Sequence, residues 1–107
     1  MVLDTNILIY FAKPTGEHLS PWVVNPSAAV SVISRIEALG FPTMSAEEKT
    51  GITRAISMLP EIGLSDAVTE RAIALRQARR MGLADAIIAA TALEHGEELV
   101  TRNVADF

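Results

Sequence analysis

Short apolar runs alternate along the chain with longer stretches of helical hydrophobic spacing. The short runs, which have the length of buried strands, occupy residues 1–3, 28–32, 61–64 and 98–101. Ser45 and Glu48 form the sequence pattern of a helix N-terminus, and apolar residues recur at helical spacing after it. Residues 84–95 are apolar on nearly every side, which predicts a central buried helix that ends at Gly96.

This alternation predicts the order of the elements and the fold class. Helices are expected at residues 6–12, 33–39, 46–59, 66–81 and 84–95, and a loop or broken helix at residues 16–27. Strands that alternate with helices form parallel sheets with helices on both faces. We therefore expect a three-layer α/β/α fold of the α/β class, with a parallel sheet of about four strands. A length of 107 residues suits one domain that spans residues 1–107.

Composition excludes several classes of protein. Half of the residues are apolar and 21% are charged, which is typical of a globular chain. The absence of cysteine excludes disulfides and thiolate metal sites. No apolar run approaches the roughly 20 residues of a membrane span and no signal peptide is recognisable, so we expect a soluble, cytoplasmic protein. A net charge of −4 argues against a passive nucleic-acid binder, but not against an enzyme that gathers carboxylates around cations.

Five polar residues near predicted strand and helix ends are candidates for chemistry. They are Asp4, Glu37, Asp85, Asn103 and Asp106. Each also has an ordinary structural explanation. Asp4 fits a helix N-cap, and Asp85 suits the positive end of a helix dipole. Glu37 would either complete a capping box with Ser34 or lie on the surface. The two residues after the fourth strand fit a turn and a solvated surface.

The positions of these residues indicate a common site. In open parallel α/β sheets, ligands bind beyond the carboxyl ends of the strands. Asp4 ends the first predicted strand, and Asn103 and Asp106 follow the fourth. Because helices run antiparallel to the strands they cover, Glu37 and Asp85 are expected to point at the same crevice. Carboxylates so close together repel one another, and hard cations such as Mg²⁺ or Mn²⁺ offset that repulsion.

A divalent cation among carboxylates is typical of a metal-dependent nuclease, because it activates water and stabilises charge on a phosphoryl group. No Ser–His–Asp arrangement competes, since His18 lies in a predicted loop and His95 at a helix end. Glycine-rich phosphate-binding motifs are also lacking. A phosphotransfer receiver domain requires paired acids at the chain start and a lysine after a late strand, which residues 99–107 lack. An aspartyl-phosphate phosphatase requires an aspartate where Asn6 stands.

Four segments together resemble a PIN-domain ribonuclease, specifically the VapC toxin type of bacterial and archaeal toxin–antitoxin pairs. They are "VLDTNILIY" at residues 2–10, "VSVISRIEALGF" at 30–41, "GLADAIIAATALEHG" at 82–96 and "LVTRNVADF" at 99–107. Their order and spacing are more specific than any one segment, and they extend over essentially the whole chain. The resemblance implies a PIN-like fold and a Mg²⁺- or Mn²⁺-dependent endoribonuclease that cleaves single-stranded or structured RNA (tRNA, rRNA or mRNA). It also implies a cognate VapB-like antitoxin and a homodimer.

The resemblance also assigns roles to individual residues. The catalytic set would be Asp4, Glu37, Asp85 and Asn103, and the metal ligands Asp4, Glu37, Asp85 and Asp106. The residues expected to position the substrate are Thr5, Asn6, Thr101 and Arg102. Many relatives have an aspartate where this chain has Asn103, and an amide binds a cation less strongly than a carboxylate does. Whether Asn103 or Asp106 completes the site therefore stays open.

The basic residues near these motifs have two interpretations. Arg76, Arg79 and Arg80 would share one helix face, and Lys13, Arg35 and Arg102 adjoin the motifs. Either group would contact RNA phosphates. Otherwise the first group would interact favourably with the helix dipole, and the second would form salt bridges.

The end of the sequence supports a second hypothesis. Family members normally continue beyond "DF" into a further strand, so the last family strand is expected to be missing from a sequence that stops at Phe107. The alternative function is a catalytically degenerate PIN fold that binds RNA or an antitoxin without cleavage. Asn103 and the short C-terminus favour it.

Overall fold

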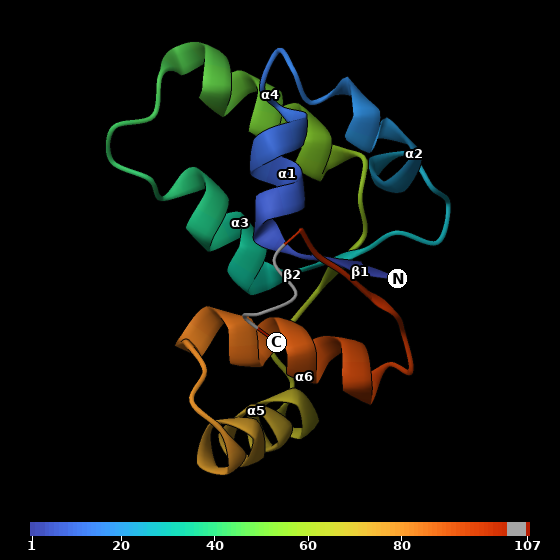
Figure 1. Ribbon diagram of the computed structural model, residues 1–107, viewed down its shortest axis with the longest axis vertical. Helices are drawn as coiled ribbons and strands as arrows, with labels where there is room; N and C mark the ends of the chain where they lie inside the picture. Colours follow the sequence, from blue (N-terminus) through green and yellow to red (C-terminus); the bar gives the residue numbers. More distant parts are fainter. Residues whose placement is uncertain (103–106) are drawn as a thin grey trace.

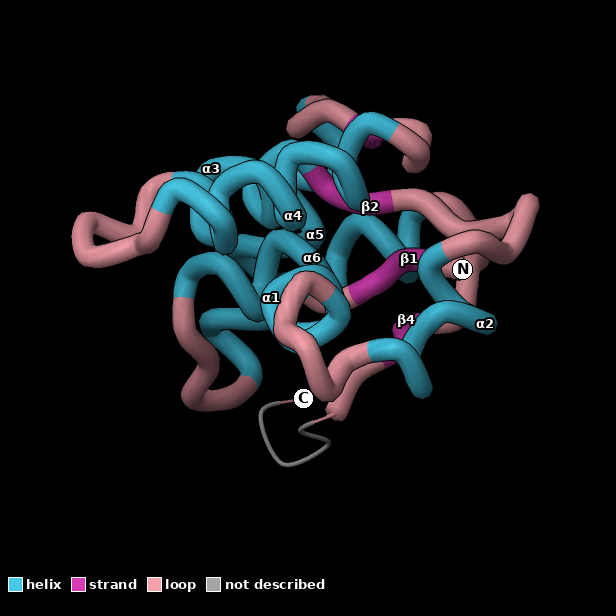
Figure 2. The backbone as a smooth tube through the Cα atoms, turned by 90° about the horizontal axis from the view of Figure 1, so that it is seen from above, coloured by secondary structure: helices cyan, strands magenta, loops and turns pink. Residues whose placement is uncertain are grey.

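Four short strands lie between two groups of helices in the computed structural model, which describes residues 1–102 and residue 107 (Figures 1 and 2). The strands are β1 (Val2–Leu3), β2 (Val30–Ser31), β3 (Glu61–Ile62) and β4 (Leu99–Val100). The helices are α1 (Thr5–Phe11), the 3-10 helix η1 (Glu17–Leu19), α2 (Ser20–Val23), α3 (Val32–Leu39), α4 (Ala46–Ser57), α5 (Asp66–Ala78) and α6 (Leu83–Glu94). The predictions for Asn103 and Asp106 lie outside the described residues.

All the described strands are parallel. Strands β1 and β4 pair with Leu3 beside Val100, and β2 and β3 form a second parallel pair. A bridge between Val2 and Ala29 joins the two pairs, and the Leu3 amide donates to the Ala29 carbonyl oxygen at 2.9 Å. The strand order is therefore β3–β2–β1–β4, which places the end of the first strand beside the end of the fourth.

Neighbouring residues of β1 face opposite layers of helices, because side chains alternate along a strand. Leu3 is fully buried in a cluster with apolar residues of α1, η1, α2 and α4. Val2 is buried instead against Ile88 and Ala92 of α6. Figure 1 accordingly shows α1, α2 and α4 on one side of the strands and α5 and α6 on the other. The predicted three-layer α/β fold is confirmed.

One predicted helix is too long. The helix expected at residues 66–81 ends at Ala78, and Arg79 has an extended backbone with φ −156° and ψ 161°. The chain leaves the helix here because Met81 is buried in the cluster between α5 and α6. The prediction that Arg76, Arg79 and Arg80 share a helix face is therefore wrong.

No described helix has both the length and the apolar character that crossing a membrane requires.

Candidate active site

Asp4 stands at the carboxyl end of β1, and the residue is 4% exposed. The β1–β4 register continues by one step beyond Leu3 and Val100, which brings Thr101 beside Asp4. Thr101 Oγ1 donates to Asp4 Oδ2 at 2.8 Å. Asp4 occupies the N-cap position of α1, but its side chain makes no capping hydrogen bond. The N-cap explanation of this carboxylate is therefore wrong.

The Asp4 carboxylate has no cationic neighbour in the part of the chain that the structure describes. The ion pairs found there join other residues, and none involves Asp4 or Glu37. A buried carboxylate without a cation is costly, and one hydroxyl donor offsets only part of that cost. An oxygen donor at this edge of a parallel sheet fits a hard divalent cation, which prefers carboxylate, amide and water ligands.

Glu37 is linked to the start of α1 through Thr5. Thr5 Oγ1 lies 2.7 Å from Glu37 Oε1 and 2.9 Å from the fully buried Ser34 Oγ. A threonine hydroxyl has one hydrogen, so charge favours donation to Glu37, and the Ser34 hydroxyl then donates to Thr5. The predicted capping box of Ser34 and Glu37 is wrong, because Ser31 caps α3 by accepting from the Ile33 amide at 3.2 Å.

Asp85 lies in the first turn of α6 and is half-buried. A Cβ built on Gly82, the N-cap residue, would lie 3.8 Å from Asp85 Oδ2, so the carboxylate is close to the helix start. The next residue, Ala86, belongs to a buried cluster against which Ile33 of α3 packs. The first turn of α6 therefore lies near α3, the helix that carries Glu37. The helix dipole also favours an anion at this position.

Two sets of hydrogen bonds hold polar side chains of the candidate site. Thr101 contacts Asp4, and Thr5 contacts both Ser34 and Glu37. Within residues 1–102 and residue 107, no three acids or histidines are grouped closely enough to hold a metal ion. The convergence of all the predicted acids on one ion stays a prediction, as does the contribution of Asn103 or Asp106.

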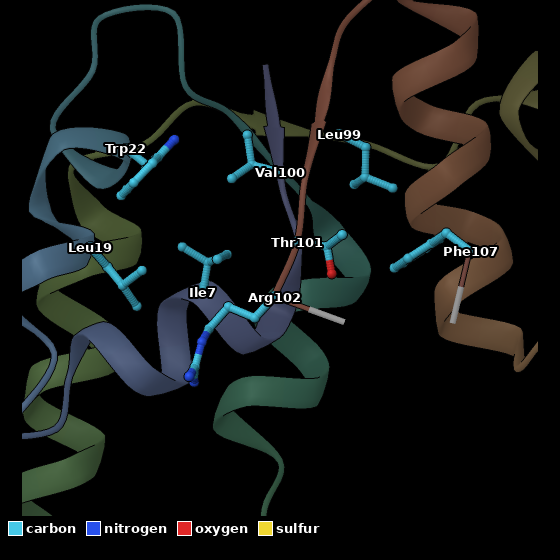
Figure 3. Close-up of a pocket in the computed structure, with 8 residues that line it drawn as sticks. All are labelled: Ile7, Leu19, Trp22, Leu99, Val100, Thr101, Arg102 and Phe107. Atoms are coloured by element: carbon cyan, nitrogen blue, oxygen red, sulfur yellow. The ribbon is translucent and has the colours of Figure 1, made fainter. Parts of the chain in front are cut away.

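Thr101 and Arg102 point to different sides of the segment that follows β4 (Figure 3). Arg102 extends toward α1, where its guanidinium carbon lies 3.9 Å from the centre of the Tyr10 ring. Both residues line a largely apolar pocket of about 580 Å³, together with Ile7, Leu19, Trp22, Leu99, Val100 and Phe107. Asn6, the remaining predicted positioning residue, is half-buried in the first turn of α1.

Two residues at the site were not predicted from the sequence. The sequence around Ser34 fits helix capping, and its spacing from Glu37 fits one helix face equally well. Tyr10 lies in an apolar segment, and it follows Asn6 by one helical turn. Arg35, a candidate phosphate contact, instead donates to Glu61 from Nε at 2.5 Å. The hydrogen bonds to Glu61, and its charge, raise the pKa of Arg35.

A sequence profile of the PIN domain matches residues 1–105. A toxin–antitoxin complex from Klebsiella pneumoniae contains a chain that is 37% identical, with a TM-score of 0.80 over 99% of this chain and 88% of that chain. VapBC2 from Rickettsia felis, bound to a DNA fragment from its promoter, is 24% identical with a TM-score of 0.78 over 97% and 88% of the two chains. FitAcB from Neisseria gonorrhoeae is 21% identical, with a TM-score of 0.78 over 99% and 89%. No curated protein sequence matches this chain.

Proposed function

Because the chain belongs to the PIN-domain family, we propose that it is a metal-dependent endoribonuclease and the toxin of a toxin–antitoxin pair. The observation that carries the enzymatic proposal is the Asp4 carboxylate, which is buried at the carboxyl edge of the sheet without a cationic partner among the described residues. The similarity to a chain of a toxin–antitoxin complex supports the biological role.

In this proposal Asp4 and Asp85 hold Mg²⁺ or Mn²⁺, and Glu37 completes the site directly or through water. Asn103 or Asp106 supplies a further ligand. When bound, such a cation supplies an activated water and stabilises charge on the phosphoryl group of RNA. The expected products carry a 5′-phosphate and a 3′-hydroxyl.

The surrounding residues hold these groups in place. The Thr101 hydroxyl fixes Asp4 by occupying Oδ2, which leaves Oδ1 for other ligands. The Thr5 hydroxyl restrains Glu37, an otherwise exposed side chain, over the start of α1. Asn6 and Arg102 are assigned to the substrate, with the amide near the scissile phosphate and the guanidinium farther along the RNA.

Replacing the central carboxylate by an amide tests the proposal. Asp4→Asn keeps the shape of the side chain but removes the charge, so we expect RNA cleavage in Mg²⁺ or Mn²⁺ to fall by at least about 100-fold. Asp66→Asn, an exposed acid in the first turn of α5, is the matched control and should cleave like the wild type. Circular dichroism checks folding. Wild-type cleavage by Asp4→Asn, or cleavage that persists in EDTA, contradicts the proposal.

A second function is a degenerate PIN fold that binds RNA or an antitoxin without cutting. It is favoured by the lack of a three-acid group within the described residues and by Asn103 in place of an acid. Calorimetric titration with Mn²⁺ beside the cleavage assay separates the two functions. Stoichiometric Mn²⁺ binding with cleavage supports the enzyme, whereas RNA binding without cleavage supports the degenerate fold.

The proposed partners are a cognate VapB-like antitoxin and a second copy of the chain. The first is supported by the Klebsiella pneumoniae relative, which is a chain of a toxin–antitoxin complex. Co-expression with the antitoxin is expected to relieve growth arrest caused by the chain alone. Light scattering of the purified protein measures the oligomer.

A further inference from the structure

Polar and aromatic residues follow one face of α1 and the turn after it, beginning at the candidate active site. Asn6, Tyr10 and Lys13 recur at helical spacing, and the Lys13 amide continues the turn by donating to the Tyr10 carbonyl oxygen at 3.1 Å. Tyr10 is 42% exposed. It lies one turn, about 6 Å by helical rise, beyond Asn6 and therefore beyond the end of β1 where Asp4 stands. This face thus leads from the carboxylates to solvent.

Arg102, in the segment after β4, links this face of α1 to the Asp4 carboxylate. It follows Thr101, which holds Asp4, and its guanidinium carbon lies 3.9 Å from the centre of the Tyr10 ring. Stacking on a ring engages the flat face of a guanidinium and leaves the N–H donors at its edge free for other partners. Arg102 is exposed and forms no ion pair with any described residue.

Lys13 is the second cation near the Tyr10 ring, and its interaction with the ring is weaker than that of Arg102. Lys13 Nζ lies 5.9 Å from the centre of the Tyr10 ring. Lys13 also lines a pocket with Glu47 and Glu48. Arg102 is the cation that lies closer to the Tyr10 ring.

We propose that Tyr10 positions Arg102 to hold an RNA phosphate that flanks the scissile bond, so that the RNA strand leaves the site along α1. The inference rests on the proposed function, which supplies RNA as the ligand. Arg102 contacts the phosphate through paired N–H donors, the geometry in which arginine binds phosphate most specifically. Tyr10 is the positioning residue, because its ring fixes the plane of the guanidinium.

Salt-dependent RNA binding tests the inference. All variants carry Asp4→Asn to prevent cleavage, and the probe is a short, labelled, unstructured single-stranded RNA of mixed sequence followed by fluorescence anisotropy. Loss of one phosphate contact lowers the slope of log K against log salt by about 0.7 for single strands. Arg102→Gln is expected to show this loss with about tenfold weaker binding at low salt. Tyr10→Leu should weaken binding about two- to fivefold, the value of an exposed cation–π contact.

Arg76→Gln is the matched control, because Arg76 is an exposed arginine on α5, on the other side of the strands, and forms no ion pair with a described residue. It should leave both affinity and slope unchanged. An unchanged slope in Arg102→Gln, or an equal loss in Arg76→Gln, overturns the inference, as does an Asp4→Asn protein that does not bind RNA. Cleavage by the protein with native Asp4 is measured in parallel. If the protein with native Asp4 cleaves RNA but Arg102→Gln does not change RNA binding, only this inference is rejected. If the protein with native Asp4 does not cleave RNA, the proposed function is rejected.

Discussion

Among the residues that the structure describes, one hydroxyl group holds the Asp4 carboxylate in place. Thr101 Oγ1 donates to Oδ2 at 2.8 Å, and Asp4 is too buried for bulk water to take over this contact fully. Groups that orient a metal ligand typically contribute 10–100-fold to metal affinity or activity. In the proposed site, Thr101 would therefore act on the metal through Asp4, without touching the ion itself.

We expect Thr101→Val to raise the Mn²⁺ concentration needed for half-maximal RNA cleavage by about 10-fold or more, because the variant keeps the shape but loses the donor. Cleavage rates measured across a Mn²⁺ series give this value. Thr53→Val, at an exposed position on α4, is the control and should match the wild type. An unchanged half-saturating concentration in Thr101→Val shows that the hydrogen bond does not orient a metal ligand.

The pair formed by Thr5 and Ser34 allows stability and activity to be separated. Thr5→Val removes the hydroxyl that restrains Glu37 and leaves the fully buried Ser34 hydroxyl without it, at a cost of about 1–3 kcal/mol in unfolding free energy. Adding Ser34→Ala removes the stranded hydroxyl, so the double variant should recover part of that stability. Cleavage should stay low in both, since Glu37 is unrestrained in both. Urea unfolding and RNA cleavage are the measurements, and a double variant that regains activity rules out the restraint.

At the scale of the element, the sequence patterns predict which segments are helices and strands but not their partners. Apolar periodicity is local, and it predicts the positions of the four described strands and of helices α1, α3, α4, α5 and α6. The contact between Asp4 and Thr101 depends on the register of β1 against β4, between residues 97 positions apart. No local pattern specifies that register. Likewise, a serine three residues before an acid fits both a capping box and a helix face, and only the observed cap at Ser31 excludes the box for Ser34 and Glu37.

The end of α1, which carries Tyr10, is held by a tight approach of the following turn. A Cβ on the buried Gly16 would collide with the Tyr10 carbonyl oxygen and the Phe11 backbone. We expect Gly16→Ala to lower the unfolding free energy by about 1–3 kcal/mol, since backbone must move to admit the methyl group. Urea unfolding measures the loss. At Gly63 a Cβ meets nothing within 4 Å, so Gly63→Ala is the control. Equal stability of the two variants contradicts the close packing of this turn.

At the scale of the whole molecule, the site exists only when distant segments are assembled. Asp4 follows β1, Glu37 lies on α3, Asp85 opens α6 and Thr101 follows β4. The strand order places β1 between β2 and β4, so the centre of the sheet brings these segments together. An unfolded chain has no such arrangement of oxygens. A cation that binds here therefore binds the folded state selectively and stabilises it.

This linkage predicts opposite effects of one substitution with and without metal. In EDTA, Asp4→Asn should be at least as stable as the wild type, because it removes a buried carboxylate that lacks a cationic partner among the described residues. At a Mn²⁺ concentration 100 times the dissociation constant, the wild type should gain about 2.7 kcal/mol and a higher Tm, while Asp4→Asn gains much less. Calorimetric unfolding with and without Mn²⁺ provides both comparisons. Because this readout needs no RNA, equal gains in the two proteins would place the metal away from Asp4 even if the chain cleaves RNA.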